Sequence, residues 1–173
     1  MQRRVEAVIS DDIVDALLDQ LNHEFRSAKL YLAMSAYCSH TDFNGSAAWL
    51  RTQHEEEQLH ALKIYDYLID QDVHVVLGEM PAPPTEFGSL LDVFQASLDH
   101  ERSMTARLND LSDLVLKHKD HATYNLLQWF VNEQVEEEAT VSEIIAKLRL
   151  VKDDGYGLLM VDNELGARTS VEL

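Results

Sequence analysis

The sequence contains little cysteine, proline or glycine, and each shortage excludes a class of structure. With one cysteine in 173 residues, Cys38, the chain cannot form an internal disulfide, which excludes a disulfide-rich fold and favours a reducing compartment. Three prolines and six glycines beside 46% apolar residues are typical of a mostly helical chain, which we expect to form one domain over residues 1–173. No apolar run reaches the roughly 20 residues that span a membrane, so we expect no membrane partner.

Positive charge is also scarce, because 14 lysines and arginines stand against 31 aspartates and glutamates and give a formal net charge of −17. Such a surface repels nucleic-acid phosphates and attracts cations, although solubility alone also accounts for it. The arginines in residues 1–4 suggest a twin-arginine signal, but Glu6, Asp11 and Asp12 interrupt the apolar region that such a signal requires. We therefore predict a cytoplasmic protein without a nucleic-acid partner.

Apolar residues recur every three or four positions along four long segments, which is the pattern of amphipathic helices. We predict four helices at about residues 12–40, 46–72, 89–117 and 121–151. Ser46 is placed to cap the second helix, and Ser89 with Asp92 to cap the third. Together the four helices form a bundle over about residues 11–151, and a short apolar helix follows at about residues 156–166.

The segment between the second and third helices, about residues 73–88, lacks the helical pattern. Pro81, Pro83 and Pro84 exclude a helix there, and the segment is too long for a simple hairpin turn. Its length suits a connection that crosses the bundle from end to end, which makes the second and third helices parallel. The sequence therefore predicts an all-α fold: a four-helix bundle with a long crossover between helices two and three, plus a short fifth helix.

Four carboxylates interrupt the apolar stripes, one near the middle of each long helix: Glu24, Glu57, Glu101 and Glu137. A buried ionised carboxylate costs several kcal/mol or more unless a positive group pairs with it, and no lysine or arginine lies in these stripes. One turn after Glu57, His60 adds an imidazole to the same helix face. Carboxylates with an imidazole suit transition metals such as iron, so we predict that these five residues bind two metal ions.

Four segments of the chain resemble a bacterial non-haem ferritin, and the match covers essentially the whole chain after about residue 10. They are YLAMSAYC at residues 31–38, EEQLH at 56–60, LQWFVNEQVEEE at 127–138 and VDNEL at 161–165. The resemblance implies a ferritin-like bundle that assembles into a hollow homo-oligomeric shell of twenty-four copies. It also implies an iron-storing ferroxidase, an oxidoreductase that oxidises ferrous iron with dioxygen or hydrogen peroxide and deposits ferric mineral inside the shell.

The same resemblance assigns a role to each predicted ligand. Glu24 and His60 would bind the first iron, Glu57 would bridge the two irons, and Glu101 and Glu137 would complete the second. All five residues would then form the di-iron ferroxidase centre.

A third iron site is also implied by the resemblance, at Glu56, Glu133 and Glu136, with Glu137 shared between the two sites. Read without the resemblance, these glutamates belong to acidic runs that are ordinarily solvated helix faces. The choice between a third metal site and a solvated face stays open at this point.

Three further residues match functional positions of the family. Gln134 matches a position beside the ligands on the side where dioxygen binds, Tyr31 a redox-active tyrosine, and Trp129 an aromatic residue able to supply an electron. Tyr31 lies seven residues after Glu24, two helical turns along the same face. Taken alone, a tyrosine at this spacing is more often a packed core residue.

Three alternatives differ from this interpretation in features that the sequence displays. A haem-containing bacterioferritin carries a second Glu-x-x-His on the fourth helix and usually a methionine after the second-helix glutamate. In this chain the residues three positions after Glu133 and Gln134 are Glu136 and Glu137, so the fourth helix lacks the histidine of that motif. Gln58 occupies the position of the methionine, so we expect no haem. A rubrerythrin-like peroxidase needs a cysteine-rich iron domain, which one cysteine cannot build. A helical interaction protein whose core glutamates bind nothing stays open, and the metal content of the purified protein separates it from a ferritin.

Overall fold

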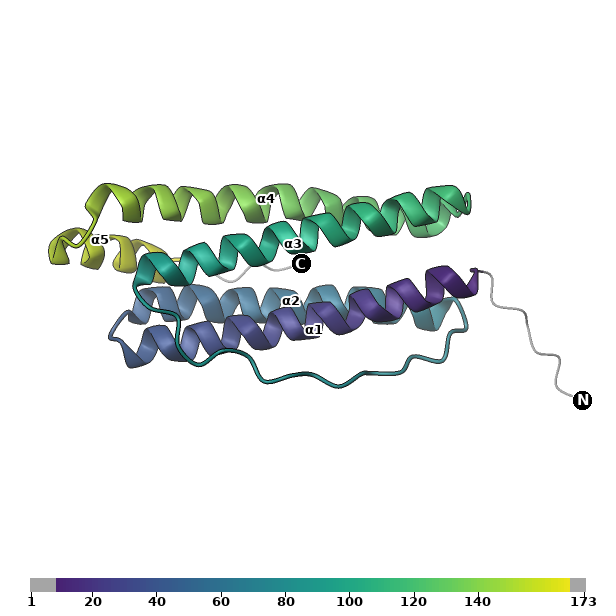
Figure 1. Ribbon diagram of the computed structural model, residues 1–173, viewed down its shortest axis with the longest axis horizontal. Coiled ribbons are helices and arrows are strands. Elements are labelled where there is room, and N and C mark those ends of the chain that lie inside the picture. The colour runs from purple at the N-terminus through teal and green to yellow at the C-terminus, as the bar shows by residue number, and fades with distance from the viewer. Residues whose placement is uncertain (1–8, 169–173) are drawn as a thin grey trace, which may run out of the picture.

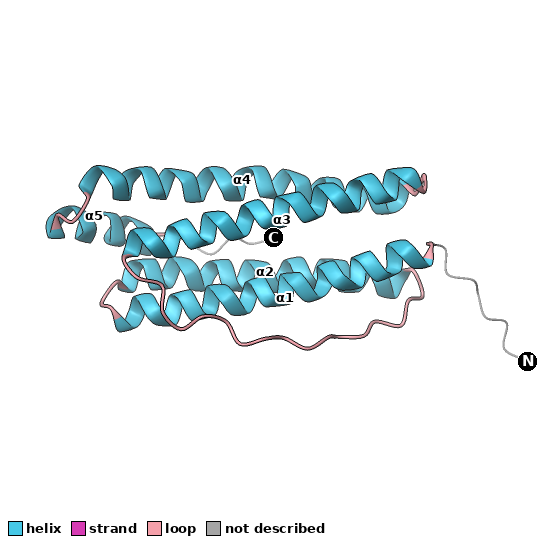
Figure 2. Cartoon of the chain, viewed as in Figure 1, coloured by secondary structure: helices cyan, strands magenta, loops and turns pink. Residues whose placement is uncertain are grey.

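The computed structural model describes residues 9–168, and these residues form helices and connecting loops without any strand. The helices are α1 (Asp11–His40), α2 (Asn44–Asp70), α3 (Leu90–Lys117), α4 (His121–Val151) and α5 (Gly155–Gly166). The four long helices lie side by side as an elongated bundle, and α5 lies at one end of it, on the left in Figure 1. The predicted all-α fold, with its long crossover and short fifth helix, is confirmed (Figure 2). The possible signal in residues 1–4 lies outside the described residues.

Within residues 9–168, none of the helices combines the length and the apolar character needed to cross a bilayer.

The crossover between α2 and α3 runs along α1 from one end of the bundle to the other (Figure 1). The backbone amide of Gly78 donates to the side-chain oxygen of Asn22 at 2.7 Å, near the first half of α1. Further along α1, the hydroxyl of Tyr37 donates to the backbone oxygen of Gly88 at 2.7 Å. Because this segment returns the chain to the end where α2 began, α2 and α3 are parallel, as predicted.

Of the two predicted helix caps, one is confirmed and one is wrong. Ser89 and Asp92 form a capping box at the start of α3, each side chain accepting from the other's backbone amide. The second helix, however, begins at Asn44, so Ser46 lies inside its first turn rather than ahead of it. The Ser46 hydroxyl instead donates to the carboxylate of Asp162 in α5 at 2.7 Å.

A polar layer at mid-height divides the core into two apolar clusters. The cluster at the α5 end includes Tyr31, Met34, Leu50, Phe94 and Leu148. The cluster at the opposite end includes Leu17, Leu21, Ile64, Leu68, Leu108 and Leu127. Apolar residues that flank the predicted carboxylates at helical spacing, such as Leu21, Leu50, Leu98 and Val141, are buried, so the helices present the expected faces to the core. The predicted carboxylates lie between the two clusters.

The fifth helix docks on the first turn of α2 through one buried carboxylate. Asp162 accepts hydrogen bonds from the backbone amides of Gly45 at 3.0 Å and Ser46 at 2.7 Å. Amides in the first turn of a helix have no partner within it, and the helix dipole favours a negative charge there. A Cβ atom on Gly45 would lie 1.8 Å from the backbone oxygen of Asp162, so the approach of α5 requires glycine at this position.

We predict that Gly45→Ala prevents α5 from docking and lowers the free energy of unfolding by roughly 2 kcal/mol or more, because buried hydrogen bonds to Asp162 are lost. Gly155→Ala is the matched control, since a Cβ at Gly155 meets no atom within 4 Å. Denaturant unfolding of both variants beside the wild type measures the effect. Equal stability of the two variants would contradict this account of α5.

Candidate metal centre

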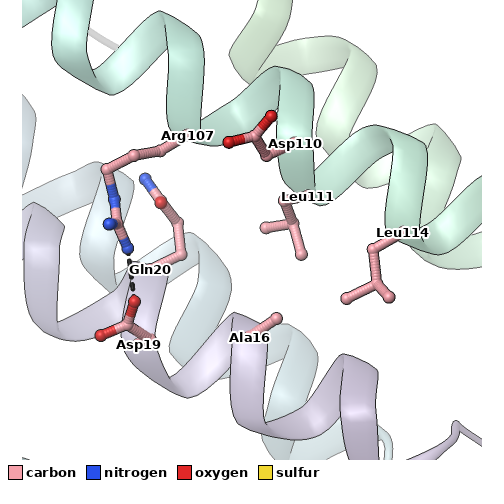
Figure 3. Close-up of a pocket in the computed structure, with 7 residues that line it drawn as sticks. All are labelled: Ala16, Asp19, Gln20, Arg107, Asp110, Leu111 and Leu114. Atoms are coloured by element: carbon pink, nitrogen blue, oxygen red, sulfur yellow. Dashed lines mark hydrogen bonds and ion pairs between the residues drawn. The ribbon is translucent and has the colours of Figure 1, made fainter.

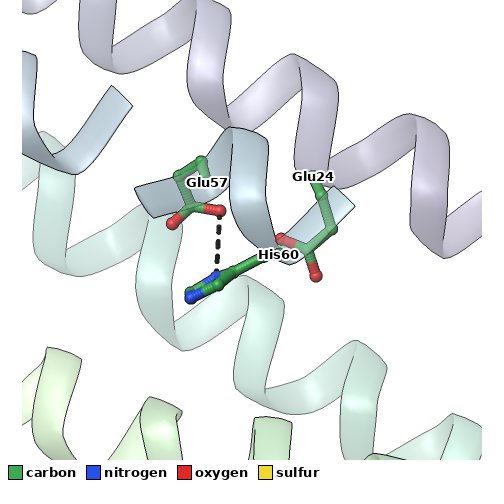
Figure 4. A group of neighbouring side chains, drawn as sticks. All are labelled: Glu24, Glu57 and His60. Atoms are coloured by element: carbon green, nitrogen blue, oxygen red, sulfur yellow. Dashed lines mark ion pairs between the residues drawn. The ribbon is translucent and has the colours of Figure 1, made fainter. Parts of the chain in front are cut away.

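Three of the predicted ligands form one compact cluster inside the bundle (Figure 4). Glu24 from α1 and Glu57 and His60 from α2 each offer one ligand atom, and these atoms all lie within 4.8 Å of one another. Nδ1 of His60 lies 3.7 Å from a carboxylate oxygen of Glu57. All three side chains are buried. The i, i+3 spacing of Glu57 and His60 turns both toward Glu24, so a single ion can contact all three.

The other two predicted ligands, Glu101 of α3 and Glu137 of α4, are held by hydrogen bonds from neighbouring side chains. Glu101 is buried; the hydroxyl of Tyr31 donates to one of its carboxylate oxygens, and the amide of Gln134 donates to the other at 3.0 Å. Half-buried Glu137 accepts from the amide of Gln53 at 2.8 Å. These hydrogen bonds orient both carboxylates in the polar layer before any ion is bound.

Burial and mutual repulsion raise the pKa of several of these carboxyls. The pKa of Glu24 lies well above its usual value because the group is buried and because Glu57 lies beside it. Burial also raises the pKa of Glu57, and the charges of Glu101 and Glu137 add to the effect. The pKa of Glu137 rises to about 7, through burial first and then the charge of Glu101. Without a cation, the centre therefore favours proton retention, and a bound cation would displace those protons.

The donor set is rich in oxygen, with four carboxylates and one imidazole. Carboxylate oxygens are preferred by hard cations, and imidazole is a common ligand of iron, zinc and copper. The five residues predicted from the sequence therefore offer a donor set whose chemistry suits iron. Their binding of metal stays a prediction.

The residues of the implied third iron site differ in their surroundings. Glu56 is buried, Glu133 is half-buried and Glu136 is exposed to solvent. Burial raises the pKa of Glu56, Arg168 opposes this rise, and the charge of Glu133 adds to it. The charge of Glu133 therefore acts on Glu56, and binding of a shared cation by these residues stays a prediction.

Two polar residues that contact predicted site residues were not singled out from the sequence. Buried Gln20 donates to Glu24 at 2.8 Å, and the hydroxyl of Ser97 lies 3.0 Å from that of Tyr31. The spacing could have revealed Gln20, because it precedes Glu24 by one helical turn on the same face. Ser97 pairs across 66 positions of sequence, for which the sequence carries no local signal.

A surface pocket of about 210 Å³ between α1 and α3 borders the centre (Figure 3). It is lined by Ala16, Asp19, Gln20, Arg107, Asp110, Leu111 and Leu114. Asp19 and Arg107 form an ion pair at 2.5 Å within this lining. Because Gln20 lines the pocket and also donates to Glu24, the pocket and the metal centre share a wall.

We predict that Glu137→Gln changes the pH dependence of stability of the metal-free protein. Below about pH 4.5 the Glu137 carboxyl is protonated in both the folded and the unfolded protein. Between about pH 4.5 and 7 it ionises in the unfolded protein but keeps its proton in the folded protein. The folded wild type therefore loses stability as the pH rises through this range. Because Glu137 is partly exposed, we expect roughly 1–2 kcal/mol from this group, less than the full shift implies. The glutamine variant lacks this loss.

Denaturant unfolding in the presence of a chelator, repeated across this pH range, measures the difference between variant and wild type. Glu136→Gln serves as the control, because Glu136 is the exposed neighbour on the same helix. A difference that stays constant with pH would show that the Glu137 carboxyl is not the group at work.

Comparison with known proteins agrees with this architecture over nearly the whole chain. A family model for the ferritin-like domain matches residues 14–151. The bacterial non-heme ferritin of Staphylococcus saprophyticus is 42% identical over 162 residues, which cover 94% of this chain and 97% of the relative. That of Staphylococcus aureus strain USA300 is 40% identical over 162 residues, covering 94% of this chain and 98% of the relative.

Comparison with solved structures also finds ferritins. An open-pore ferritin from the hyperthermophilic archaeon Archaeoglobus fulgidus superposes with a TM-score of 0.92 at 42% identity, over 93% of this chain and 99% of the other. A humanized archaeal ferritin superposes with a TM-score of 0.93 at 40% identity, over 95% and 99% of the two chains. The resemblance inferred from the sequence motifs is thereby confirmed, and the chain belongs to the ferritin family.

Proposed function

We propose that this protein stores iron and acts as a ferroxidase, oxidising ferrous iron at the centre made by Glu24, Glu57, His60, Glu101 and Glu137. One observation carries the proposal: four carboxylates share a polar layer of the bundle, and no lysine or arginine in residues 9–168 forms an ion pair with them. Such a layer is stable in its ionised form only with cations bound. The names of the relatives, bacterial non-heme ferritins, support iron as the cation.

In this proposal two ferrous ions enter as substrate and share Glu57. Glu24 and His60 bind the first ion and Glu101 and Glu137 the second. A bridging position for Glu57 is supported by its cluster with Glu24 and His60 and by the charges of Glu101 and Glu137, which also act on it. Binding displaces protons from these carboxyls, and the anionic oxygen ligands favour the ferric over the ferrous state.

The oxidant, dioxygen or hydrogen peroxide, takes electrons from the bound ions. Two ferrous ions supply two electrons, whereas reduction of dioxygen to water takes four. Tyr31 is placed to supply one more, since its hydroxyl contacts Glu101 and Ser97. Burial, and then the charges of Glu101 and Glu57, raise the pKa of Tyr31 well above its usual value, so it remains a neutral phenol. When Tyr31 loses an electron, the adjacent carboxylate of Glu101 can accept its proton.

Two neighbours complete the proposed site. Gln134, which donates to Glu101, would stand on the side where dioxygen binds. The ring of Trp129 packs edge-on against His60 with centroids 5.3 Å apart, close enough to supply an electron. A third iron at Glu56, Glu133 and Glu136 is another electron source.

We further propose that the chain assembles into the 24-subunit shell implied by the resemblance, and that ferric product moves into its interior and hydrolyses to a mineral. The match of this chain to almost the full length of solved ferritin chains supports such an assembly. The cytoplasm as its location and the lack of haem stay predictions from the sequence.

Replacing the proposed bridge tests the centre directly. We expect Glu57→Ala to slow ferrous oxidation by about tenfold or more, because both ions lose a ligand. Removing a residue that merely hydrogen-bonds a metal ligand already lowers metal affinity or activity by about 10–100-fold. Its metal-free form should be as stable as the wild type or more stable, since one buried carboxylate is removed. The measurements are the initial rate of ferric formation per subunit and the particle mass.

The matched control is Glu55→Ala, which removes an exposed carboxylate two positions earlier on α2. If correctly assembled Glu57→Ala oxidises iron at the rate of this control, the assignment of the centre is wrong.

Replacement of Tyr31 tests its proposed electron transfer. We expect Tyr31→Phe to retain the fold and to bind iron, because only a hydroxyl is lost, although Ser97 and Glu101 lose their shared partner. Repeated turnover should slow more than the first turnover, and the number of irons oxidised per dioxygen should change. Freeze-quenched wild type should show a tyrosyl radical that the variant lacks. An unchanged stoichiometry, recycling rate and radical signal would identify Tyr31 as a packing residue.

A further inference from the structure

An arginine from the C-terminal end of the described chain reaches the implied third iron site. Arg168 lies just beyond α5, and its Nη2 atom is 2.9 Å from each carboxylate oxygen of Glu56 on α2. Its Nη1 atom donates to the side-chain oxygen of Gln53. The guanidinium lies over the ring of Trp49, with its central carbon 4.9 Å from the ring centroid. Arg168 is therefore held by α2 through three separate side chains.

These contacts give Glu56 an arginine partner, whereas no lysine or arginine among residues 9–168 forms an ion pair with the four central carboxylates. The Glu56 side chain is only 11% exposed, and a carboxylate at that depth needs a counter-charge. The Arg168 side chain is 24% exposed, so solvent can receive it when it leaves. Since a guanidinium stays charged at every accessible pH, Arg168 competes for Glu56 under all conditions in which iron would bind.

We propose that Arg168 is a positioning residue of the third iron site, which holds Glu56 in the metal-free protein and must be displaced before iron can bind there. The inference rests on the proposed function of Glu56, Glu133 and Glu136 as iron ligands. It adds that a side chain of the same subunit competes with iron for that site.

The displacement also reaches the central pair of ions through Gln53. Gln53 accepts from Arg168 with its side-chain oxygen and donates to Glu137 with its amide at 2.8 Å. When Arg168 leaves, the oxygen of Gln53 loses its partner and its amide becomes freer to turn. Iron at the third site therefore loosens the hold on Glu137, which is a proposed ligand of the second central ion.

Arg168 stays close to Glu56 because Asp162, six residues before Arg168, anchors α5 to α2. Asp162 binds the first turn of α2, and Glu56 lies about three turns further along the same helix. The short tether keeps the local concentration of the guanidinium at Glu56 high while still allowing it to withdraw.

The test is an anaerobic calorimetric titration of the assembled, metal-free protein with ferrous iron, in the wild type and in Arg168→Gln. We expect the third ion per subunit to bind about tenfold more tightly in the variant. The first ion should be unchanged, and the second should change less than the third, because Gln53 links Arg168 to Glu137. Arg168→Lys keeps the charge without the fork geometry and should fall between the two. It also carries the test if the glutamine variant fails to assemble.

Two controls test whether the gain in affinity for the third ion arises at Glu56. Arg51→Gln removes an exposed arginine from α2 that pairs with Glu55 rather than Glu56, and it should leave all three affinities unchanged. Adding Glu56→Gln to Arg168→Gln should abolish the gain, because the contested ligand is then gone.

The outcomes separate this inference from the proposed function. If the wild type binds no iron, the proposed function fails. If two ions bind as expected but Arg168→Gln leaves the third unchanged or weakens it, only the role of Arg168 as a competitor is overturned.

Discussion

The placement of four carboxylates at mid-height of the bundle, three of them buried and Glu137 half-buried, is the constraint on which the rest of the structure depends. No lysine or arginine of residues 9–168 forms an ion pair with them. Two apolar clusters, one on each side of this layer, hold the four helices together and stabilise the unfavourable arrangement between them. Within the layer, hydrogen bonds from Gln20, Tyr31 and Gln134 orient carboxylates that would otherwise repel one another. Apolar packing thus supplies the stability, and the layer supplies an affinity for cations.

Local features of the sequence were sufficient to predict most of the fold. The stripes follow helical spacing, three prolines mark the crossover, and Ser89 with Asp92 marks a helix start; each signal lies within a few residues. The Ser46 prediction failed because a distant carboxylate, Asp162, occupies the helix start that Ser46 was expected to cap. The central glutamates and His60 were recognisable because a buried carboxylate violates the apolar pattern. Arg168 was not, because its partner lies 112 positions away.

Two carboxylate interactions join the C-terminal part of the chain to α2. In one the carboxylate belongs to α5, and in the other it belongs to α2. At the start of α2, Asp162 of α5 binds the helix's own amides. In the middle of α2, Glu56 of the helix binds Arg168 from the segment after α5. Since α2 also carries Glu57 and His60, the docking of α5 and the arrangement of the metal ligands share one helix. A change that displaces α5 therefore acts on the proposed iron sites without touching a ligand.

The two proposed iron sites differ in how their charge is balanced, and this difference implies an order of filling. No lysine or arginine of residues 9–168 forms an ion pair with the central carboxylates, so protons or bound cations are needed to neutralise their charge. Glu56 already has Arg168, so an ion arriving there must first break two contacts of 2.9 Å and the bond to Gln53. The same hydrated cation therefore gains more free energy at the centre than at the third site. We infer that the central pair fills first, and that the third ion binds when the centre is already occupied.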